Sequence, residues 1–404
     1  MATSALPSIG FSGAGFLGCY HVGVAACLKR QGWLGLDDAN HHTTTNEPTT
    51  IKPLVPLLTG VSAGSMVAAA TAAGIEPEPD GMDVVLTAAR RTRELSTKSQ
   101  LPTFDALTPG YSLIDAVEGS FREAIVKALG GTLPLQSQQQ QHDYGCSVDS
   151  LYDIDPELFQ RRFPNGSLRI GLTDKRALLS SFPPPSPLSS LPKAYRYVDS
   201  YRNAEDVVAA CMLSSYIPGV TGPLFNVKDG KAGNDAMKRA SRQLREMTRL
   251  GLVKDGRTGV PPTESEIESS RHDEEDDSTQ YWDGGIADVF PTFDDNTIIV
   301  SPINGMYSNP AICPALQQSN EVENQGSINN SSVLDRLQSY VPTLPATFRH
   351  CSKSNLGLNV ENARAVKEMI LSSDDEQLYQ RFRDGYDDTT RFLNERGLHR
   401  VFKG

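Results

Sequence analysis

The stretch LVPLLTGVSAGSMVAAATAA at residues 54–73 joins an apolar run to an alanine-rich segment through a serine that stands between glycines. The compact apolar run at 54–59 is typical of a buried parallel strand, and 62–73 predicts a helix. The same order occurs earlier, with a short strand at 8–11, the glycine turn GAGFLG, and a helix at 19–30. Because strand, glycine turn and helix occur twice near the start of the chain, the sequence predicts an α/β sandwich.

The rest of the chain alternates predicted helices and strands with polar segments. Apolar residues at spacings of three and four predict a helix at 111–129, and Asn203 is placed to cap a helix at 204–214. The remaining predicted strands are 169–174, 194–200 and 296–301, and the remaining predicted helices are 361–371 and 376–396. Polar composition predicts flexible surface inserts near 36–50, 134–148 and 228–279.

Composition excludes some classes of function. The 404 residues carry a formal net charge of -11, so there is no basic face for phosphates and we expect no nucleic-acid partner. Six cysteines are scattered without CxxC spacing, which favours free thiols in a reducing compartment. The sequence has neither the pattern of a secretory signal nor an apolar run long enough to span a membrane. We therefore expect a cytoplasmic protein that is peripheral at a lipid surface.

The GVSAG motif has the form of a nucleophile elbow, a serine on a tight turn between a strand and a helix. Gly60 and Gly64 permit the tight backbone and leave room for a substrate beside Ser62. The N-terminus of the following helix favours the negative charge that develops during attack. We predict Ser62 as the nucleophile, and the alternative is a structural serine in a turn.

The GAGFLG turn, which ends at Gly18, has two functional interpretations. A dinucleotide-binding fold would require an acidic residue after a second strand, but the acidic residues near that distance lie in a polar loop. The backbone N–H groups of Gly13, Ala14 and Gly15 are instead predicted to form an oxyanion hole. The remaining alternative is a glycine turn used only for packing.

The WDGG motif supplies the predicted base, Asp283. Gly284 and Gly285 let a carboxylate lie on a turn at the end of a strand, and partial burial would raise its pKa from about 3.9 towards a useful value. In a dyad, Asp283 accepts the proton of Ser62 during attack and then activates the water that releases the acyl group. The alternative for DGG is a simple β-turn.

A histidine base has less support from the sequence. His350 and His399 follow Asp283 but have no supporting motif, and the early elbow leaves room for about one strand before it, unlike an α/β hydrolase. His21 follows the glycine turn on a predicted helix, where we expect it to pack rather than to react. No metal or organic cofactor is expected.

These three motifs together resemble those of the patatin-like phospholipases. FSGAGFLGCYHVGVAACL, NAEDVVAACMLSSYIPG, YWDGGIADVFPTF, IIVSPINGMYSNPAICP and GYDDTTRFLNERGL look like segments of the adipose triglyceride lipase branch, with which Leu17 also agrees. The resemblance implies a three-layer α/β/α sandwich with a mainly parallel sheet, a Ser62–Asp283 dyad and no catalytic histidine. It implies a catalytic domain over 1–310 and a polar insert with a C-terminal helical extension over 311–404.

The resemblance also implies a function and partners. We expect hydrolysis of acylglycerol esters at a lipid droplet or membrane surface, with triacylglycerol favoured and a protein coactivator among the partners. The alternatives are a phospholipase A or an acylglycerol transacylase on the same site, and a non-catalytic lipid-surface protein.

Overall fold

A computed structural model of the chain gives the fold. It describes residues 7–34, 57–98, 112–132, 153–179, 193–218, 220–222, 235–263, 280–315, 354–355 and 359–398. The strands are β1 (Ile9–Phe11), β2 (Leu58–Gly60), β3 (Leu168–Asp174), β4 (Tyr195–Val198), β5 (Val253–Asp255), β6 (Tyr281–Asp283), β7 (Ile298–Val300), β8 (Met306–Tyr307), β9 (Ala311–Ile312) and β10 (Ser354–Asn355). The helices and helical turns are η1 (Gly15–Leu17), α1 (Gly18–Arg30), α2 (Ala63–Ala73), η2 (Pro77–Gly81), α3 (Met82–Lys98), α4 (Leu113–Ala128), α5 (Pro156–Arg162), α6 (Lys175–Leu179), α8 (Ala204–Ser214), α9 (Asp235–Arg249), α11 (Gly284–Ala287), α14 (Val360–Ile370) and α15 (Asp375–Glu395).

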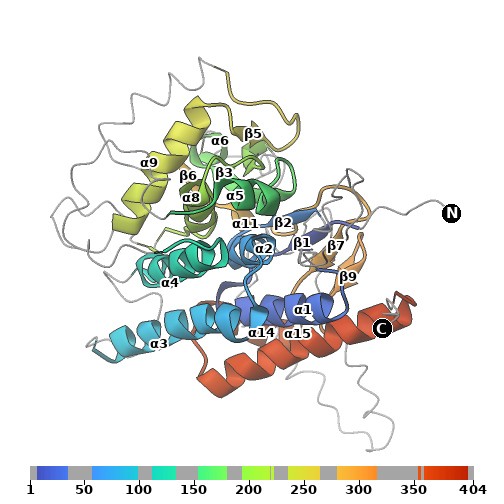
Figure 1. Ribbon diagram of the computed structural model, residues 1–404. Coiled ribbons are helices and arrows are strands. Elements are labelled where there is room, and N and C mark those ends of the chain that lie inside the picture. Colours follow the sequence, from blue (N-terminus) through green and yellow to red (C-terminus); the bar gives the residue numbers. More distant parts are fainter. Residues whose placement is uncertain are drawn as a thin grey trace, which may run out of the picture.

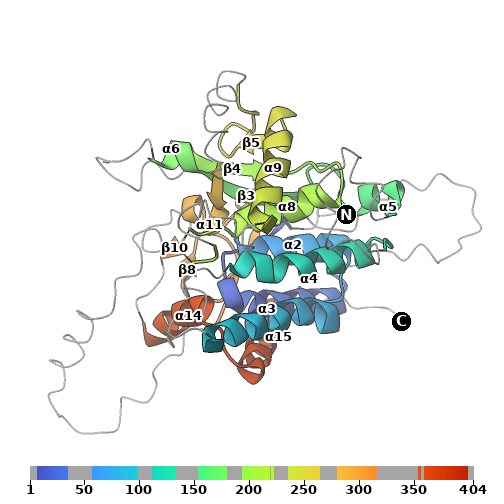
Figure 2. The same ribbon diagram turned by 90° about the vertical axis from the view of Figure 1, so that its left-hand side faces the viewer.

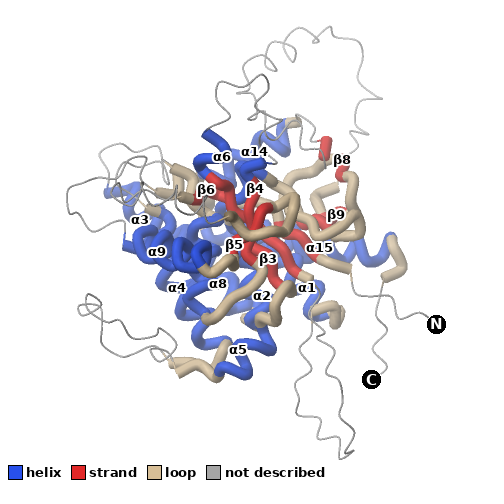
Figure 3. Tube along the Cα trace, turned by 90° about the horizontal axis from the view of Figure 1, so that it is seen from above, coloured by secondary structure: helices blue, strands red, loops and turns tan. Residues whose placement is uncertain are grey.

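A mixed sheet lies at the centre of the described residues (Figure 3). Its strands follow the order β5-β4-β3-β2-β1-β7-β9, and β6 also pairs with β3. The pairs from β3 through β2, β1 and β7 to β9 are parallel, whereas β4, β5 and β6 run antiparallel to their neighbours. The predicted α/β sandwich with a mainly parallel sheet is therefore confirmed, and the antiparallel edge is an addition that the sequence did not predict.

Strand β3 brings two distant parts of the chain to the same edge. β2 pairs with Leu168–Ile170, and β6 pairs with Leu172–Asp174. β4 pairs with residues 170–173 of β3, a range that overlaps the partners of β2 and the partners of β6. β4 therefore occupies the opposite edge of β3. The last residue of β6, Asp283, pairs with Leu172, and the last residue of β2, Gly60, pairs with Ile170, so the two strands end close together on β3.

Helices pack on the sheet in two layers (Figure 1). The inner helices α1, α2 and α8 carry small or apolar buried residues, such as Ala68, Ala72 and Val207, which allow close approach to the strands. Outside them, α4 packs on α2 and α8, α9 packs on α8, and α15 lies along α1.

The contact between α15 and α1 is close and specific. A β-carbon on Gly385 would collide with the backbone carbonyl of Tyr20, and the Tyr20 hydroxyl donates a 2.8 Å hydrogen bond to Asp388 Oδ2. The predicted C-terminal helical extension therefore packs directly on the first helix of the fold.

The predicted elements are confirmed to within a few residues wherever the structure describes them. α1, α2, α4, α8, α14 and α15 match the six predicted helices, and Asn203 caps α8 by accepting a 3.0 Å hydrogen bond from the Asp206 N–H. The inserts predicted near 36–50 and 134–148 lie outside the described residues, as does the part of the predicted strand at 54–56.

The prediction of a flexible surface insert over 228–279 is wrong for the part that forms α9 and β5. The apolar residues of α9 recur at helical spacing and are buried against α8 and α4, while the charged residues between them lower the overall hydropathy and hid the pattern. The buried apolar residues of α9 are Ala236, Met237, Ala240, Leu244 and Met247.

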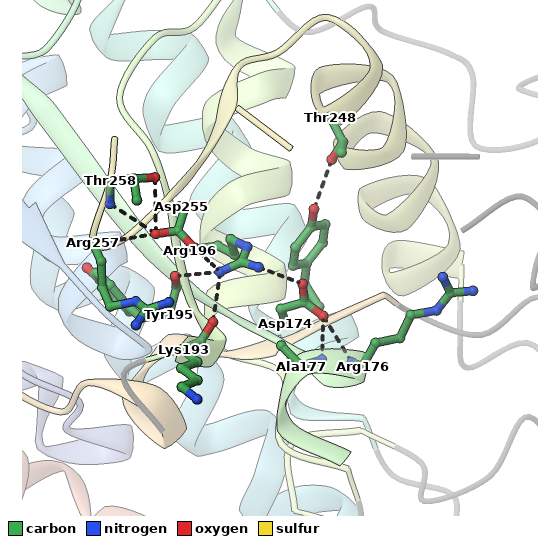
Figure 4. Close-up of polar contacts among 11 residues, drawn as sticks. Asp174, Arg176, Ala177, Lys193, Tyr195, Arg196, Thr248, Asp255, Arg257 and Thr258 are labelled. Carbon is green, nitrogen blue, oxygen red and sulfur yellow. Dashed lines mark hydrogen bonds and ion pairs between the residues drawn. The ribbon is translucent and has the colours of Figure 1, made fainter. Parts of the chain in front are cut away.

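An arginine holds the antiparallel edge together (Figure 4). Arg196 of β4 lies between Asp174 of β3 and Asp255 of β5, with nitrogen–oxygen distances of 3.4 and 2.8 Å. It also donates a 2.9 Å hydrogen bond to the Lys193 carbonyl. The three strands are therefore joined by charge as well as by backbone pairing.

Two further observations concern the described residues alone. None of their helices combines the length and the apolarity needed to cross a membrane. Cys19, Cys27, Cys211 and Cys313 are free thiols, as predicted. Cys146 and Cys351 lie outside the described residues.

Candidate active site

Ser62 lies on a strained turn between β2 and α2. Its backbone has φ 54° and ψ -138°, a conformation that residues with a side chain rarely adopt and that is kept where the surroundings enforce it. Gly64 enforces it on one side, because a β-carbon there would lie 2.5 Å from the Phe11 carbonyl oxygen. On the other side, a β-carbon on Gly60 would lie 2.7 Å from the α-carbon of Ser65. These packing constraints account for both glycines of the motif.

Ser214, at the end of α8, holds the turn from behind. The Ser62 N–H donates to the Ser214 carbonyl and to its hydroxyl, both at 3.0 Å, and that hydroxyl donates a 2.6 Å hydrogen bond to the Gly171 carbonyl. Sequence reasoning gave Ser214 no role, although it lies in the NAEDVVAACMLSSYIPG segment that carried part of the resemblance.

The glycine turn lies directly beside Ser62. A β-carbon on Gly13 would lie 3.6 Å from the Ser62 β-carbon, and one on Gly18 would lie 3.5 Å from that of Ala63. The N–H groups of Gly13 and Ala14 donate no hydrogen bond to any described residue. Gly15 follows with φ 52° and begins η1. The turn thus places backbone N–H groups without a described acceptor close to the serine.

Asp283 ends β6 and is buried. Its N–H donates a 2.8 Å hydrogen bond to the Tyr216 carbonyl, and its own carbonyl accepts one of 2.6 Å from the Thr173 hydroxyl. The side chain caps α11, because Oδ1 accepts a 2.7 Å hydrogen bond from the Gly285 N–H. A strand end held on three sides leaves the carboxylate little freedom to turn.

The two glycines after Asp283 allow this approach. A β-carbon on Gly284 would lie 2.9 Å from the Val61 side chain, next to Ser62, and 2.5 Å from the Gly171 backbone. A β-carbon on Gly285 would lie 2.9 Å from Asp283 Oδ1. DGG therefore does more than form a turn: it brings the aspartate against the strand end that precedes the serine.

The electrostatics of Asp283 suit a base. Burial raises the pKa of this carboxyl to about 7, while the Ser62 hydroxyl and the Gly285 N–H act in the opposite direction by stabilising the carboxylate. Oδ2 has no hydrogen-bond partner among the described residues. With its pKa raised to about 7, this carboxyl has a proton affinity suited to accepting a proton near neutral pH.

The histidines are not part of this group as far as the structure describes them. His21 is fully buried in α1 between Phe11 and Tyr20, and burial lowers its pKa to about 3, so it is a neutral packing residue, as predicted. His350 and His399 lie outside the described residues. Within the described residues there is also no cluster of His, Cys, Asp and Glu that could hold a metal ion.

Comparison with known families identifies the family of the chain. A family model described as patatin-like phospholipase matches residues 10–294, which is more than half of the chain and includes Ser62 and Asp283. The chain belongs to the patatin-like phospholipase family. Membership implies lipid acyl hydrolase activity. A search of curated proteins found no match.

An apolar cavity opens beside Ser62 in this patatin-like fold. Its volume is about 110 Å³, and it lies between α1, α2, α3 and α4. The cavity is lined on one side by Leu113, Ile114, Val117 and Phe121 of α4. The apolar face predicted at 111–129 therefore forms part of the cavity wall and also packs in the core. α3, which the sequence did not predict, lines it with Val84, Val85 and Ala88.

Proposed function

We propose that the chain hydrolyses acylglycerol esters through an acyl-enzyme, with Ser62 as nucleophile and Asp283 as general base. The observation that carries this proposal is the position of the buried Asp283 at the end of β6, packed through Gly284 against Val61, which leads into the strained turn of Ser62. Asp283 accepts the serine proton as the hydroxyl attacks the ester carbonyl. The same carboxyl then returns the proton to the leaving alcohol and activates a water molecule for deacylation.

The oxyanion formed in each step is held by backbone donors. The N–H groups of Gly13, Ala14 and Gly15 are beside the serine, and the N-terminus of α2 adds a favourable dipole. Loss of one such donor costs about 3 kcal/mol of transition-state stabilisation in comparable sites. No step requires a metal ion or an organic cofactor.

The cavity supports an apolar acyl group as the part of the substrate that enters. Its lining is almost entirely apolar and includes Ser62, so an acyl chain in the cavity would present its ester carbonyl to the hydroxyl. Among acyl lipids we propose triacylglycerol as the preferred substrate, on the resemblance of five segments to the adipose triglyceride lipase branch. This places the working site of the enzyme at a lipid droplet or membrane surface, where a protein coactivator could bind.

Release of fatty acid from emulsified triolein tests the proposal. Ser62→Ala and Asp283→Asn should each lower the rate by at least about a thousandfold, as losses of nucleophile and base do in other serine hydrolases. Ser120→Ala and Asp80→Asn are matched controls, because these residues lie outside the site, and they should keep the rate of the unchanged chain. Activity that survives both site substitutions would refute the dyad.

A lipid panel with product analysis tests the substrate. Preferential release from phosphatidylcholine would favour a phospholipase A, and acyl transfer between glycerides would favour a transacylase. Failure of Ser62 to react with a fluorophosphonate probe in the folded chain would instead support a non-catalytic lipid-surface protein.

A further inference from the structure

A small second core joins the glycine turn and the start of α2 to α14. It is separate from the main core and collects residues of the glycine turn, the residue after Ser62, and residues between α11 and β7, together with one face of α14. The members that concern the site are Ala14, Ala63, Phe290, Ala365, Val366 and Met369. α14 thus shares this core with the glycine turn and with the first residue of α2, although it lies beyond the residues 10–294 that the family model matches.

The closest approach is between α14 and the glycine turn. A β-carbon on Gly15 would lie 2.9 Å from the Met369 carbonyl carbon and would collide with its oxygen. The last turn of α14 therefore rests on the backbone of Gly15, on a turn whose N–H groups face the proposed oxyanion. Figure 2 shows α14 at the same end of the sheet as α11, the helix that Asp283 caps.

A pair of asparagines fixes the first turn of α14 in place. The Asn304 N–H donates a 3.1 Å hydrogen bond to Asn362 Oδ1, and Asn362 Nδ2 donates one of 3.0 Å to the Asn304 carbonyl. Asn359 adds a third bond of 3.0 Å, from its Nδ2 to Asn304 Oδ1. Asn304 and Asn362 are each 2% exposed, so these bonds lie out of water, where leaving one unmade is costly.

We infer that α14 positions the oxyanion hole, with Asn362 as the residue that sets its register. The inference rests on the proposed function, because it assigns a role in the same reaction. Asn362 does not touch the substrate: it holds α14 on Asn304, and α14 in turn holds Gly15 and the turn before it at the distance from Ser62 that the transition state requires. Displacement by about 1 Å far from the reacting atoms can lower a rate by about a hundredfold.

Kinetics of Asn362→Ala on p-nitrophenyl butyrate test the inference. We expect kcat to fall by about 10- to 100-fold, while KM stays within about twofold. The reason is that the turn binds the oxyanion of the transition state more strongly than it binds the carbonyl group of the bound substrate. Inhibition by a trifluoromethyl ketone, which forms a tetrahedral adduct with an oxyanion, should weaken by a similar factor. Lys367→Ala, on the exposed side of α14, is the matched control and should change neither quantity.

The outcomes separate the inference from the proposed function. A folded Asn362→Ala variant with unchanged kcat and unchanged inhibition would overturn the inference, even if Ser62→Ala is inactive. An active Ser62→Ala variant would overturn the proposed function instead. If Asn362→Ala does not fold, Asn359→Ala is measured with the same two assays. It removes the bond to Asn304 and the N-cap bond from the Asn362 N–H, and an unchanged kcat and inhibition would count against the inference.

Discussion

Gly64 leaves no room for a side chain, because a β-carbon there would collide with the backbone carbonyl oxygen of Ser12. This contact joins the serine turn to the end of β1 and so sets the distance between the two glycine motifs. An alanine at position 64 would place a methyl group where backbone atoms already lie, and neither segment has a flexible side chain that could move away.

Gly64→Ala is therefore expected to destabilise the fold by about 3 kcal/mol or more and to lower esterase activity in whatever protein folds. Gly119→Ala is the matched control. Gly119 lies on the exposed side of α4 with open space around it, so the change should stabilise that helix by about 0.5–1 kcal/mol. Urea denaturation of both variants checks the prediction, and equal stabilities would contradict it.

The pH dependence of the reaction should report Asp283. Only the carboxylate can accept the Ser62 proton, and burial raises the pKa of this carboxyl to about 7. The value of kcat/KM should therefore rise with pH and level off above about 8. Release of butyric acid followed by titration measures the profile, and a rate already constant from about pH 5 upwards would show that the base is a carboxyl with an ordinary pKa.

The fold and much of the site could be predicted because the decisive signals are local. The strands before Gly13 and Ser62 and the helices after them follow from composition within about a dozen residues. The glycines are recognisable because tight turns and close backbone contacts exclude other residues, as at Gly60 and Gly284. Asp283 could be predicted in the same way, from the two glycines that follow it.

What could not be predicted depends on contacts between distant segments. Nothing local to β3 indicates that β2 and β6 share one of its edges, which is the arrangement that brings the strand end before Ser62 close to the strand end at Asp283. Ser214 acts on Ser62 across 152 positions in the sequence. The sequence did not predict helix α9, because its arginines and other polar residues outnumber the apolar residues that pack into the core.

The stability of the chain should also depend on pH through Asp283. Its pKa is raised from 3.8 in the unfolded chain to about 7 in the fold, so between these values the folded chain binds more protons at this site. The contribution of Asp283 to the free energy of unfolding is therefore fully present below pH 3.8, and it declines as the pH rises towards about 7. One unit of pKa corresponds to about 1.4 kcal/mol, which makes the loss between about pH 5 and pH 8 roughly 3 kcal/mol.

Asp283→Asn should lack this contribution, because the amide does not titrate. The free energy of unfolding, measured in urea at the two pH values, should fall more for the unchanged chain than for the variant. An equal change in both proteins would show that the carboxyl has the same pKa folded and unfolded.

Arg196→Met should destabilise the antiparallel edge. The change leaves Asp174 and Asp255 without the cation between them, and both of these carboxylates are mostly buried. Removing one partner of such a group costs about 3 kcal/mol. Arg364→Met is the matched control, because Arg364 is largely exposed in its pair with Glu368 and should contribute less than about 1 kcal/mol. Equal unfolding free energies of the two variants would contradict the prediction.

The length of acyl chain that the enzyme accepts should depend on Ala70. This residue lines the cavity on the same helix as Ser62, eight positions further along and thus about 12 Å away along the axis of α2. Ala70→Phe would fill the cavity at that depth, where a palmitoyl chain extends and a butyryl chain does not reach. Hydrolysis of p-nitrophenyl palmitate should fall by about tenfold, equivalent to roughly 1.4 kcal/mol of lost binding in the transition state, while hydrolysis of the butyrate ester stays unchanged.

Ala70→Ser, which alters polarity with little change of volume, should leave the ratio of the two rates close to that of the unchanged chain. A ratio unchanged by phenylalanine would mean that the acyl chain takes another path from Ser62.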